Sequence, residues 1–152
     1  MFMPTPFPQL YLEIAKKIAD ERSIDPFTKV GCVATNELNE LIGASYNGFA
    51  RGYEPDFDIS LEKNRDEKNL LVYHAEQNMI LRHPRGSIHT LYITHSPCSN
   101  CAKLIAGHGV KSVVYSEEYH REVNFKKVFD KYNIKYQKYE PRTTKSANPV
   151  PN

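Results

Sequence analysis

Hydrophobic residues recur at helical spacing in some segments of this chain and alternate with polar residues in others. Leu10, Ile14 and Ile18 lie four positions apart, and Tyr11 and Ala15 widen the same stripe. They predict an amphipathic helix over residues 9–22, after an irregular, proline-rich lead-in at 1–8. Further helices are expected at 60–68, where the charged residues predict a solvated helix, and at 123–132. A helix that starts at His74 should end at Pro84 and Gly86, and a helix at 98–106 should be capped by Gly107 and Gly109. Short apolar or alternating segments predict strands at 30–35, 40–45, 90–94, 111–115 and 134–139.

The connections between these elements predict an α/β fold. A turn-rich segment at 36–39 joins the first two strands into a hairpin. The later strands alternate with helices, which implies parallel pairing through right-handed crossovers. We therefore expect one domain over residues 1–140, followed by a disordered tail at 141–152 that is rich in Pro, Thr, Ser and Asn. The long polar segment at 53–69 has the length of a functional or mobile loop.

Composition narrows the functional classes. The net charge of +2 over 152 residues is too small to indicate a nucleic-acid surface. No basic N-terminal region precedes an apolar run, and no apolar stretch approaches a membrane span, so neither a signal peptide nor a membrane partner is expected. Three cysteines do not make a disulfide framework, which favours a reducing, cytoplasmic location. Cys32, inside the first strand, is interpreted as a buried structural cysteine.

Two short motifs carry the candidate chemistry, His74-Ala75-Glu76 and Pro97-Cys98-Ser99-Asn100-Cys101. A catalytic zinc takes three protein ligands and keeps one position open for water, and His74, Cys98 and Cys101 supply one imidazole and two thiolates. Cysteines at i and i+3 of a helix start share one face, and the helix N-terminus favours their thiolates. The pattern H-x-E with P-C-x-x-C is the known signature of zinc-dependent nucleobase deaminases.

Charge counting assigns a role to Glu76. Two thiolates and a neutral imidazole cancel the charge of Zn²⁺, so water at the metal needs a base, and Glu76 is the carboxylate beside the ligand His74. Two alternatives stay open at this point. A Cys-x-x-Cys pair can be redox-active, or it can belong to a structural zinc site whose fourth ligand would be Cys32, His95 or His108.

The chain resembles deoxycytidylate (dCMP) deaminases, within the wider cytidine deaminase-like superfamily, over residues 10–140. The resemblance rests on the motifs Lys29-Val30-Gly31-Cys32-Val33, Ser45-Tyr46-Asn47-Gly48, His74-Ala75-Glu76-x-Asn78 and Ser96-Pro97-Cys98-x-x-Cys101-Ala102-Lys103. It implies a three-layer α-β-α sandwich around a five-stranded mixed sheet of order 2-1-3-4-5.

The resemblance also implies a reaction and a site. The reaction is the hydrolysis of dCMP to dUMP and ammonia, which feeds dTMP synthesis. His74, Cys98 and Cys101 would be the zinc ligands, Glu76 the proton shuttle and Asn47 a sugar contact. The alternative for Asn47 is a turn residue in a left-handed conformation beside Gly48.

Members of the family are often hexamers that dCTP activates and dTTP inhibits. The resemblance places this regulation at the segment containing Tyr46, Gly48 and Arg51, and it allows Mg²⁺ to accompany the regulatory triphosphate. The chain departs from the family pattern at Ser45, where a glycine is usual, and at Ala50, where many members have proline. Serine would strain the backbone if that position needed a positive φ.

Further expectations concern the substrate contacts and the number of metals. Loop ends predict Ser23, Lys29, Arg51 and Tyr119 as donors to a 5′-phosphate, with Lys29 and Arg51 as the cations, and Ser96 is a further expected substrate-binding residue. Residues 52–69 contain no Cys or His, so one zinc per chain is expected rather than a catalytic and a structural one.

Two other functions remain as alternatives. A tRNA adenosine or another nucleobase or nucleoside deaminase would share the zinc motif, but its nucleic-acid substrate would favour a basic stripe, and acidic residues interleave with the C-terminal lysines here. A non-enzymatic zinc-binding module would not need the intact Glu76.

Overall fold

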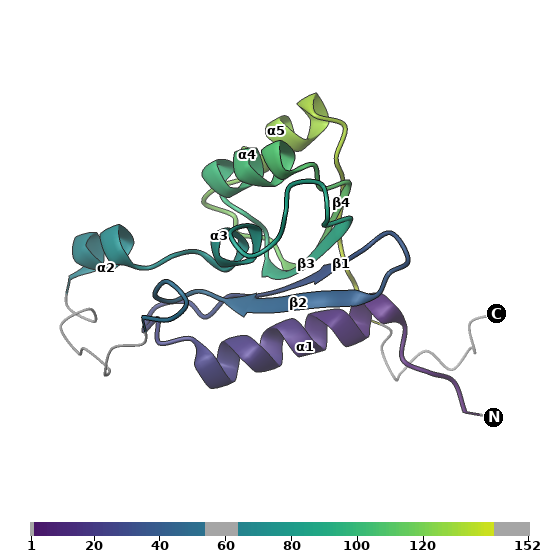
Figure 1. Ribbon diagram of the computed structural model, residues 1–152, viewed down its shortest axis with the longest axis horizontal. Coiled ribbons are helices and arrows are strands. Elements are labelled where there is room, and N and C mark those ends of the chain that lie inside the picture. The colour runs from purple at the N-terminus through teal and green to yellow at the C-terminus, as the bar shows by residue number, and fades with distance from the viewer. Residues whose placement is uncertain (1, 54–63, 142–152) are drawn as a thin grey trace.

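A five-stranded mixed sheet forms the centre of the molecule, and helices cover both of its faces (Figure 1). The computed structural model describes residues 2–53 and 64–141. The strands are β1 Gly31–Thr35, β2 Leu41–Tyr46, β3 Thr90–His95, β4 Ser112–Glu117 and β5 Lys135–Lys138. The helices are α1 Phe7–Arg22, α2 Arg65–Leu71, α3 Ala75–Ile80, α4 Ser99–His108 and α5 Phe125–Lys131.

The strand order β2-β1-β3-β4-β5 confirms the predicted topology. β1 pairs antiparallel with both β2 and β3, and the three strands from β3 to β5 are parallel. The hairpin between β1 and β2 turns through Asn39, whose φ of 61° lies in the left-handed region that asparagine tolerates. The crossovers from β3 through α4 and from β4 through α5 place both helices on the same face of the sheet (Figure 1).

Helix α1 covers the other face of the sheet, and its backbone lies very close to that of β1. A Cβ atom built on Gly31 of β1 would lie 1.8 Å from the carbonyl oxygen of Ala15, so only glycine permits this approach. The buried stripe of α1 accordingly runs through Tyr11, Ala15 and Ala19. The predicted stripe of Leu10, Ile14 and Ile18, widened by Tyr11 and Ala15, is confirmed at Tyr11 and Ala15, whereas Leu10 is exposed and Ile14 and Ile18 are half-buried.

The core on the α3–α4–α5 side is mostly aliphatic and aromatic. Met79 of α3 and Ile105 of α4 are fully buried against the sheet, and Phe125 and Phe129 of α5 pack edge to face with ring centroids 5.8 Å apart. α3 and α4 contact each other and α4 contacts α5 on this face. The N-terminal ends of α3 and α4 are thereby fixed by packing rather than by the loops that precede them.

Several predicted boundaries were wrong. α1 begins at Phe7 rather than 9, because Pro8 in its first turn needs no amide partner there. Gly107 lies inside α4, and Gly109 alone caps it, with a φ of 93°. α2 covers Arg65–Leu71, later than the predicted 60–68, and residues 60–63 lie outside the described residues, as does the tail from 142.

Replacing Gly31 with Ala should destabilise the fold. The added Cβ would meet backbone atoms of α1, which cannot swing aside, and overpacking of this kind costs about 1–3 kcal/mol. Urea unfolding followed by circular dichroism measures the change.

Gly107→Ala is the matched control, since nothing lies within 4 Å of its added Cβ. It should leave stability unchanged or raise it by up to about 1 kcal/mol, because alanine is the better helix former. Equal stabilities of the two variants would contradict the close approach of α1 to β1.

Candidate active site

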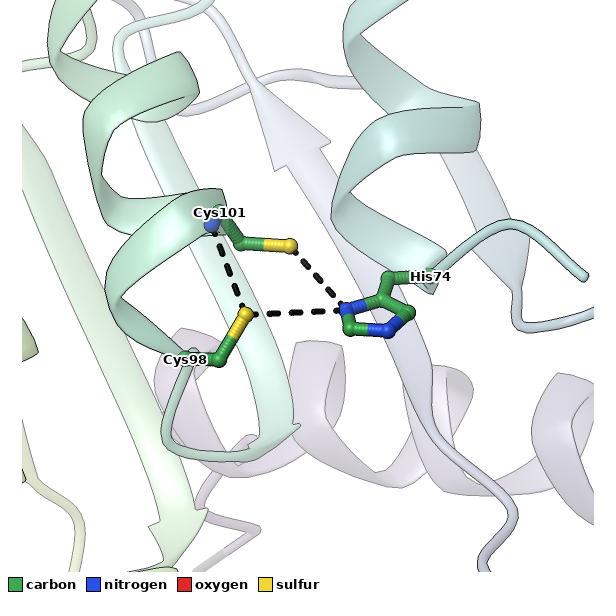
Figure 2. A group of neighbouring side chains, drawn as sticks. All are labelled: His74, Cys98 and Cys101. Atoms are coloured by element: carbon green, nitrogen blue, oxygen red, sulfur yellow. Dashed lines mark hydrogen bonds between the residues drawn. The ribbon is translucent and has the colours of Figure 1, made fainter. Parts of the chain in front are cut away.

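Two helix N-termini bring the His-x-Glu and Cys-x-x-Cys motifs together. His74 is the residue that caps α3, and Cys98 caps α4, where its sulfur accepts a hydrogen bond from the Cys101 amide at 3.5 Å. The His74 amide donates to the Gln77 side chain at 2.7 Å, which fixes the start of α3. Figure 2 shows the histidine reaching from one helix toward the two cysteines of the other.

The three side chains form a cluster with metal-ligand geometry. His74 Nδ1 lies 3.2 Å from Cys101 Sγ and 3.7 Å from Cys98 Sγ, and the three ligand atoms all lie within 4.8 Å of one another (Figure 2). Zinc bonds of about 2.0 Å to nitrogen and 2.3 Å to sulfur require separations of this size in a tetrahedral site. The donor set of one imidazole and two thiols fits zinc, with Nδ1 as the histidine ligand atom.

The two cysteines shift each other's pKa in opposite directions. A hydrogen bond from the Cys101 thiol lowers the pKa of Cys98 to about 4, and the Cys98 sulfur raises the pKa of Cys101 well above its ordinary value. The pKa of His74 is raised, chiefly by its hydrogen bond with Cys98. Zinc takes cysteine as the thiolate, so metal binding at this cluster releases any thiol proton that remains.

The sequence left Cys32, His95 and His108 as candidates for the fourth ligand of a structural zinc site. Among the described residues, none of the three belongs to the cluster. Cys32 is fully buried in the core, where burial raises the pKa of its thiol. His95 lines the pocket beside the cluster, and His108 Nε2 lies 3.1 Å from the His83 carbonyl oxygen. A three-residue donor set leaves a coordination position open, as catalytic zinc sites do.

Glu76 is buried beside this cluster, with 4% of its surface exposed. Burial raises the pKa of its carboxyl group above the ordinary value, against the opposing effect of His74. Its side chain lines the same pocket as His74 and Cys98 but is not one of the clustered ligands. A carboxyl group with a raised pKa next to a metal site is suited to accepting and releasing protons.

A pocket of about 220 Å³ opens onto the cluster. Asn47, Ser96 and Tyr119, three of the predicted substrate contacts, line it. Ser23 and Lys29 do not belong to its described lining: Ser23 donates to the Asn47 side chain at 2.6 Å, and Lys29 Nζ lies 3.4 Å from the Asp20 carbonyl oxygen. Ser96 accepts a hydrogen bond from the Tyr119 amide at 2.7 Å, which joins these two parts of the wall.

Asn47 has an architectural role in the pocket wall. Its Oδ1 accepts from Ser23 Oγ and the Val30 amide, and its Nδ2 donates to Asp25 Oδ2 and the Thr28 carbonyl oxygen. Asn47 is not among the residues with positive φ, so the left-handed turn interpretation is wrong. Its function as a sugar contact stays a prediction.

The proposed regulatory residues lie outside the described lining of the pocket. The Arg51 guanidinium donates to the Tyr46 hydroxyl at 2.8 Å, and Gly48 forms a backbone bridge with Tyr73, just before His74. Ser45 adopts extended backbone in β2, so the expected strain is absent, and its hydroxyl donates to the Ala75 carbonyl oxygen in α3 at 2.7 Å. This segment therefore contacts the start of α3, the helix that His74 caps.

Sequence reasoning missed the ion pair between Asp25 and Lys68. Both residues line the pocket, with Lys68 Nζ 2.8 Å from Asp25 Oδ2. Burial alone would raise the pKa of Asp25, but Lys68 and the amides of Phe27 and Thr28 outweigh it and hold that pKa below its ordinary value. No local sequence pattern predicts this pair, because Asp25 and Lys68 are 43 positions apart. From sequence, Asp25 is interpreted as part of a helix break and Lys68 as part of a solvated helix.

Comparisons with known proteins agree with this geometry. Residues 6–117 match the family model described as the cytidine and deoxycytidylate deaminase zinc-binding region. The chain is 37% identical over 135 residues to a probable deoxycytidylate deaminase of Caenorhabditis elegans, covering 85% of this chain and 68% of that protein. It is 29% identical to the human deoxycytidylate deaminase over 148 residues, covering 91% and 83% of the two chains.

Solved structures share the fold. The dCMP deaminase of cyanophage S-TIM5, crystallised with dCMP and dUMP, superimposes with a TM-score of 0.68 at 25% identity, covering 91% of this chain and 100% of that one. A tRNA:A34 deaminase superimposes with a TM-score of 0.52 at 17% identity, which shows a common fold alone. Among the described residues, no helix has the length and apolar character needed to span a bilayer.

Replacing Cys98 with Ala should empty the metal site. The wild-type protein is expected to carry about one zinc per chain, and loss of one of three protein ligands removes most of the affinity. Inductively coupled plasma mass spectrometry of dialysed protein measures the zinc content.

Cys32→Ala provides the control, because it removes a thiol that lies outside the cluster. It should retain zinc. Full occupancy in Cys98→Ala, or loss of zinc in Cys32→Ala alone, would contradict the ligand assignment.

Proposed function

The chain belongs to the cytidine and deoxycytidylate deaminase family, and from this premise we propose that it converts dCMP and water to dUMP and ammonia. The observation that carries the proposal is the His74–Cys98–Cys101 cluster at a pocket that also contains the buried Glu76. Relatives that match this chain over most of their length are named deoxycytidylate deaminase or probable deoxycytidylate deaminase. The zinc ligands, Glu76 and the substrate contacts are part of the proposal.

Each proposed residue has a separable task. His74, Cys98 and Cys101 hold the zinc, which when bound supplies a Lewis acid that makes water nucleophilic at neutral pH. Glu76 takes a proton from the attacking water, delivers it to the ring nitrogen N3, and passes a further proton to the departing amino group. The water oxygen thus replaces the nitrogen at C4, and ammonia leaves.

Burial prepares Glu76 for this shuttle. A carboxylate with an ordinary pKa is a weak base toward water, whereas the raised pKa of Glu76 makes it a stronger base, and the carboxylic acid that it forms can still protonate N3 and the amino group. The pocket wall that surrounds it includes Val30, Val72 and Ala75, whose apolar side chains limit the access of bulk water.

A tRNA substrate is less well supported. Two lysines near the C-terminus pair with acidic neighbours, Lys126 with Glu118 at 2.6 Å and Lys138 with Glu140 at 3.5 Å. Paired charges do not present the cationic stripe that a polynucleotide backbone binds. A small nucleotide therefore accounts better for the pocket.

Assembly and regulation are finer parts of the proposal. We infer a homo-hexamer in which dCTP, with Mg²⁺, activates and dTTP inhibits through the segment that includes Tyr46, Gly48 and Arg51. The unstrained Ser45 supports this view, because its hydroxyl joins β2 to α3, the helix that His74 caps. We also place the enzyme in the cytoplasm, where Cys98 and Cys101 stay reduced and dUMP is available for dTMP synthesis.

The proposed reaction predicts a narrow substrate range. In a panel of cytosine, deoxycytidine, CMP, dCMP and dCTP, dCMP should be deaminated with the highest kcat/KM, as followed by ultraviolet absorbance.

Glu76→Gln should retain zinc and lose about 10²–10⁴-fold in kcat, because the amide cannot carry the proton.

Two outcomes would contradict this assignment. A wild-type protein that releases ammonia from another member of the panel but not from dCMP has a different substrate. Near-normal turnover by zinc-loaded Glu76→Gln would exclude Glu76 as the proton shuttle.

Regulation predicts a shift in the saturation curve. dCTP should lower the dCMP concentration needed for half-saturation and dTTP should raise it, by at least about 5-fold, the lower end of ordinary allosteric couplings. Initial rates with and without each effector measure the shift, and sedimentation velocity on the same samples measures the assembly. Superimposable curves would mean that the chain performs the chemistry without the regulation.

A further inference from the structure

One cationic side chain enters the pocket. Of the residues described as lining it, Lys68 is the single lysine or arginine. The substrate under the proposed function carries a dianionic 5′-phosphate, which charged donors bind most strongly. We propose that Lys68 binds the 5′-phosphate of the nucleotide and that Asp25 positions it; this assignment rests on the proposed function.

Asp25 orients the Lys68 ammonium group but occupies only one of its hydrogen-bond donors. Its ammonium group donates one hydrogen bond to Asp25 Oδ2 at 2.8 Å, and no second one is found among the described residues. An ammonium group has three N–H donors, so two remain for a ligand. Its Nζ also lies 5.0 Å from the centre of the Phe27 ring, which confines the side chain from another direction.

Asp25 is built to hold Lys68 rather than to repel an anion. The Phe27 and Thr28 amides donate to its Oδ1, and Asn47 Nδ2 and Lys68 Nζ donate to its Oδ2. Its side chain is 4% exposed and that of Lys68 is 14% exposed. The carboxylate charge is thus distributed over four donors, and Lys68 is the one of them that can also reach a ligand in the pocket.

The position of Lys68 suits the phosphate end of a nucleotide. Figure 1 shows α2, which carries Lys68, set apart from α3 and α4, whose first turns carry the metal cluster. Both ends line one continuous pocket. A nucleotide with its base at His74 and Cys98 therefore extends its sugar and phosphate toward Asp25 and Lys68.

The cations predicted from sequence are engaged elsewhere. Lys29 approaches the Asp20 carbonyl oxygen outside the pocket, and Arg51 donates to the Tyr46 hydroxyl. Neither belongs to the described lining. Lys68 takes the place that the sequence had assigned to Lys29.

The test compares a nucleotide with its nucleoside in Lys68→Gln. The kcat/KM for dCMP should fall by about 10- to 100-fold, the size of one charge-assisted hydrogen bond, while the kcat/KM for deoxycytidine should change by less than about 2-fold. Lys68→Arg, which keeps the charge, should recover part of the loss for dCMP. Equal losses for dCMP and deoxycytidine would show that Lys68 only supports the fold, and no loss for dCMP would show that another group binds the phosphate.

Two controls separate the charge of Lys68 from its tether. The double variant Asp25→Asn, Lys68→Gln removes both charges of the ion pair, so no buried carboxylate is left alone. The new amide nitrogen at position 25 would face Asn47 Nδ2, and damage to the pocket wall from this contact would lower the turnover of dCMP and deoxycytidine alike. The double variant should show the same selective loss for dCMP; recovery of wild-type selectivity would overturn the proposal. Lys126→Gln removes a lysine from an ion pair outside the pocket and should leave both substrates unaffected.

Binding of the product distinguishes this assignment from the proposed function. Calorimetry with the zinc-loaded protein should show that Lys68→Gln weakens dUMP about 10-fold or more and leaves deoxyuridine unchanged. A wild type that does not deaminate dCMP contradicts the proposed function, and the dUMP and deoxyuridine affinities still decide the role of Lys68. Equal affinities of the wild type for dUMP and deoxyuridine would overturn the phosphate assignment.

Discussion

The convergence of two helix N-termini is the constraint on which the site depends. His74 and Cys98 both occupy capping positions, where the backbone is still extended and the side chain turns back toward the helix. The same geometry makes the first turn of each helix electropositive, and a thiolate or hydroxide is stabilised there. Packing of α3 and α4 on one face of the sheet brings the two caps within bonding distance of a single ion, so the metal site is a consequence of the fold rather than of a flexible loop.

On the other side of the pocket, the buried carboxylate of Asp25 holds the surrounding backbone and side chains in place. Asn47 donates a hydrogen bond to Asp25, and the two side chains together bind the backbone of residues 27, 28 and 30. Nearly every donor and acceptor of the two side chains is used, which is the condition under which a buried polar network stabilises one conformation. Lys68 attaches α2 to this network, and α2 has no buried residues of its own that could anchor it by packing.

The sequence predicted those features that local spacing determines. Cysteines at 98 and 101 share a helix turn, and Glu76 follows His74 by two residues, so the motif alone identifies them; the alternation of strands and helices likewise yields the sheet order once the family resemblance is added. Features that depend on distant contacts were not accessible. The close approach of α1 to β1 depends on Gly31, and the position of Lys68 depends on Asp25, which lies 43 positions away. Neither relation leaves a periodic trace in the sequence.

Two carboxyl groups share this pocket, and their environments drive their pKa values in opposite directions. Burial raises the pKa of Glu76, whereas at Asp25 the effect of burial is outweighed by Lys68 and two backbone amides. A carboxylate that receives four donors is a fixed charge, since protonating it would break the hydrogen bonds that hold the wall. A carboxyl group whose charge is disfavoured by burial can gain and lose a proton within one turnover. Under the proposed function, proton transfer belongs to the end of the pocket that holds the proposed metal ligands and positioning belongs to the end that holds Lys68, with a carboxyl group at each end.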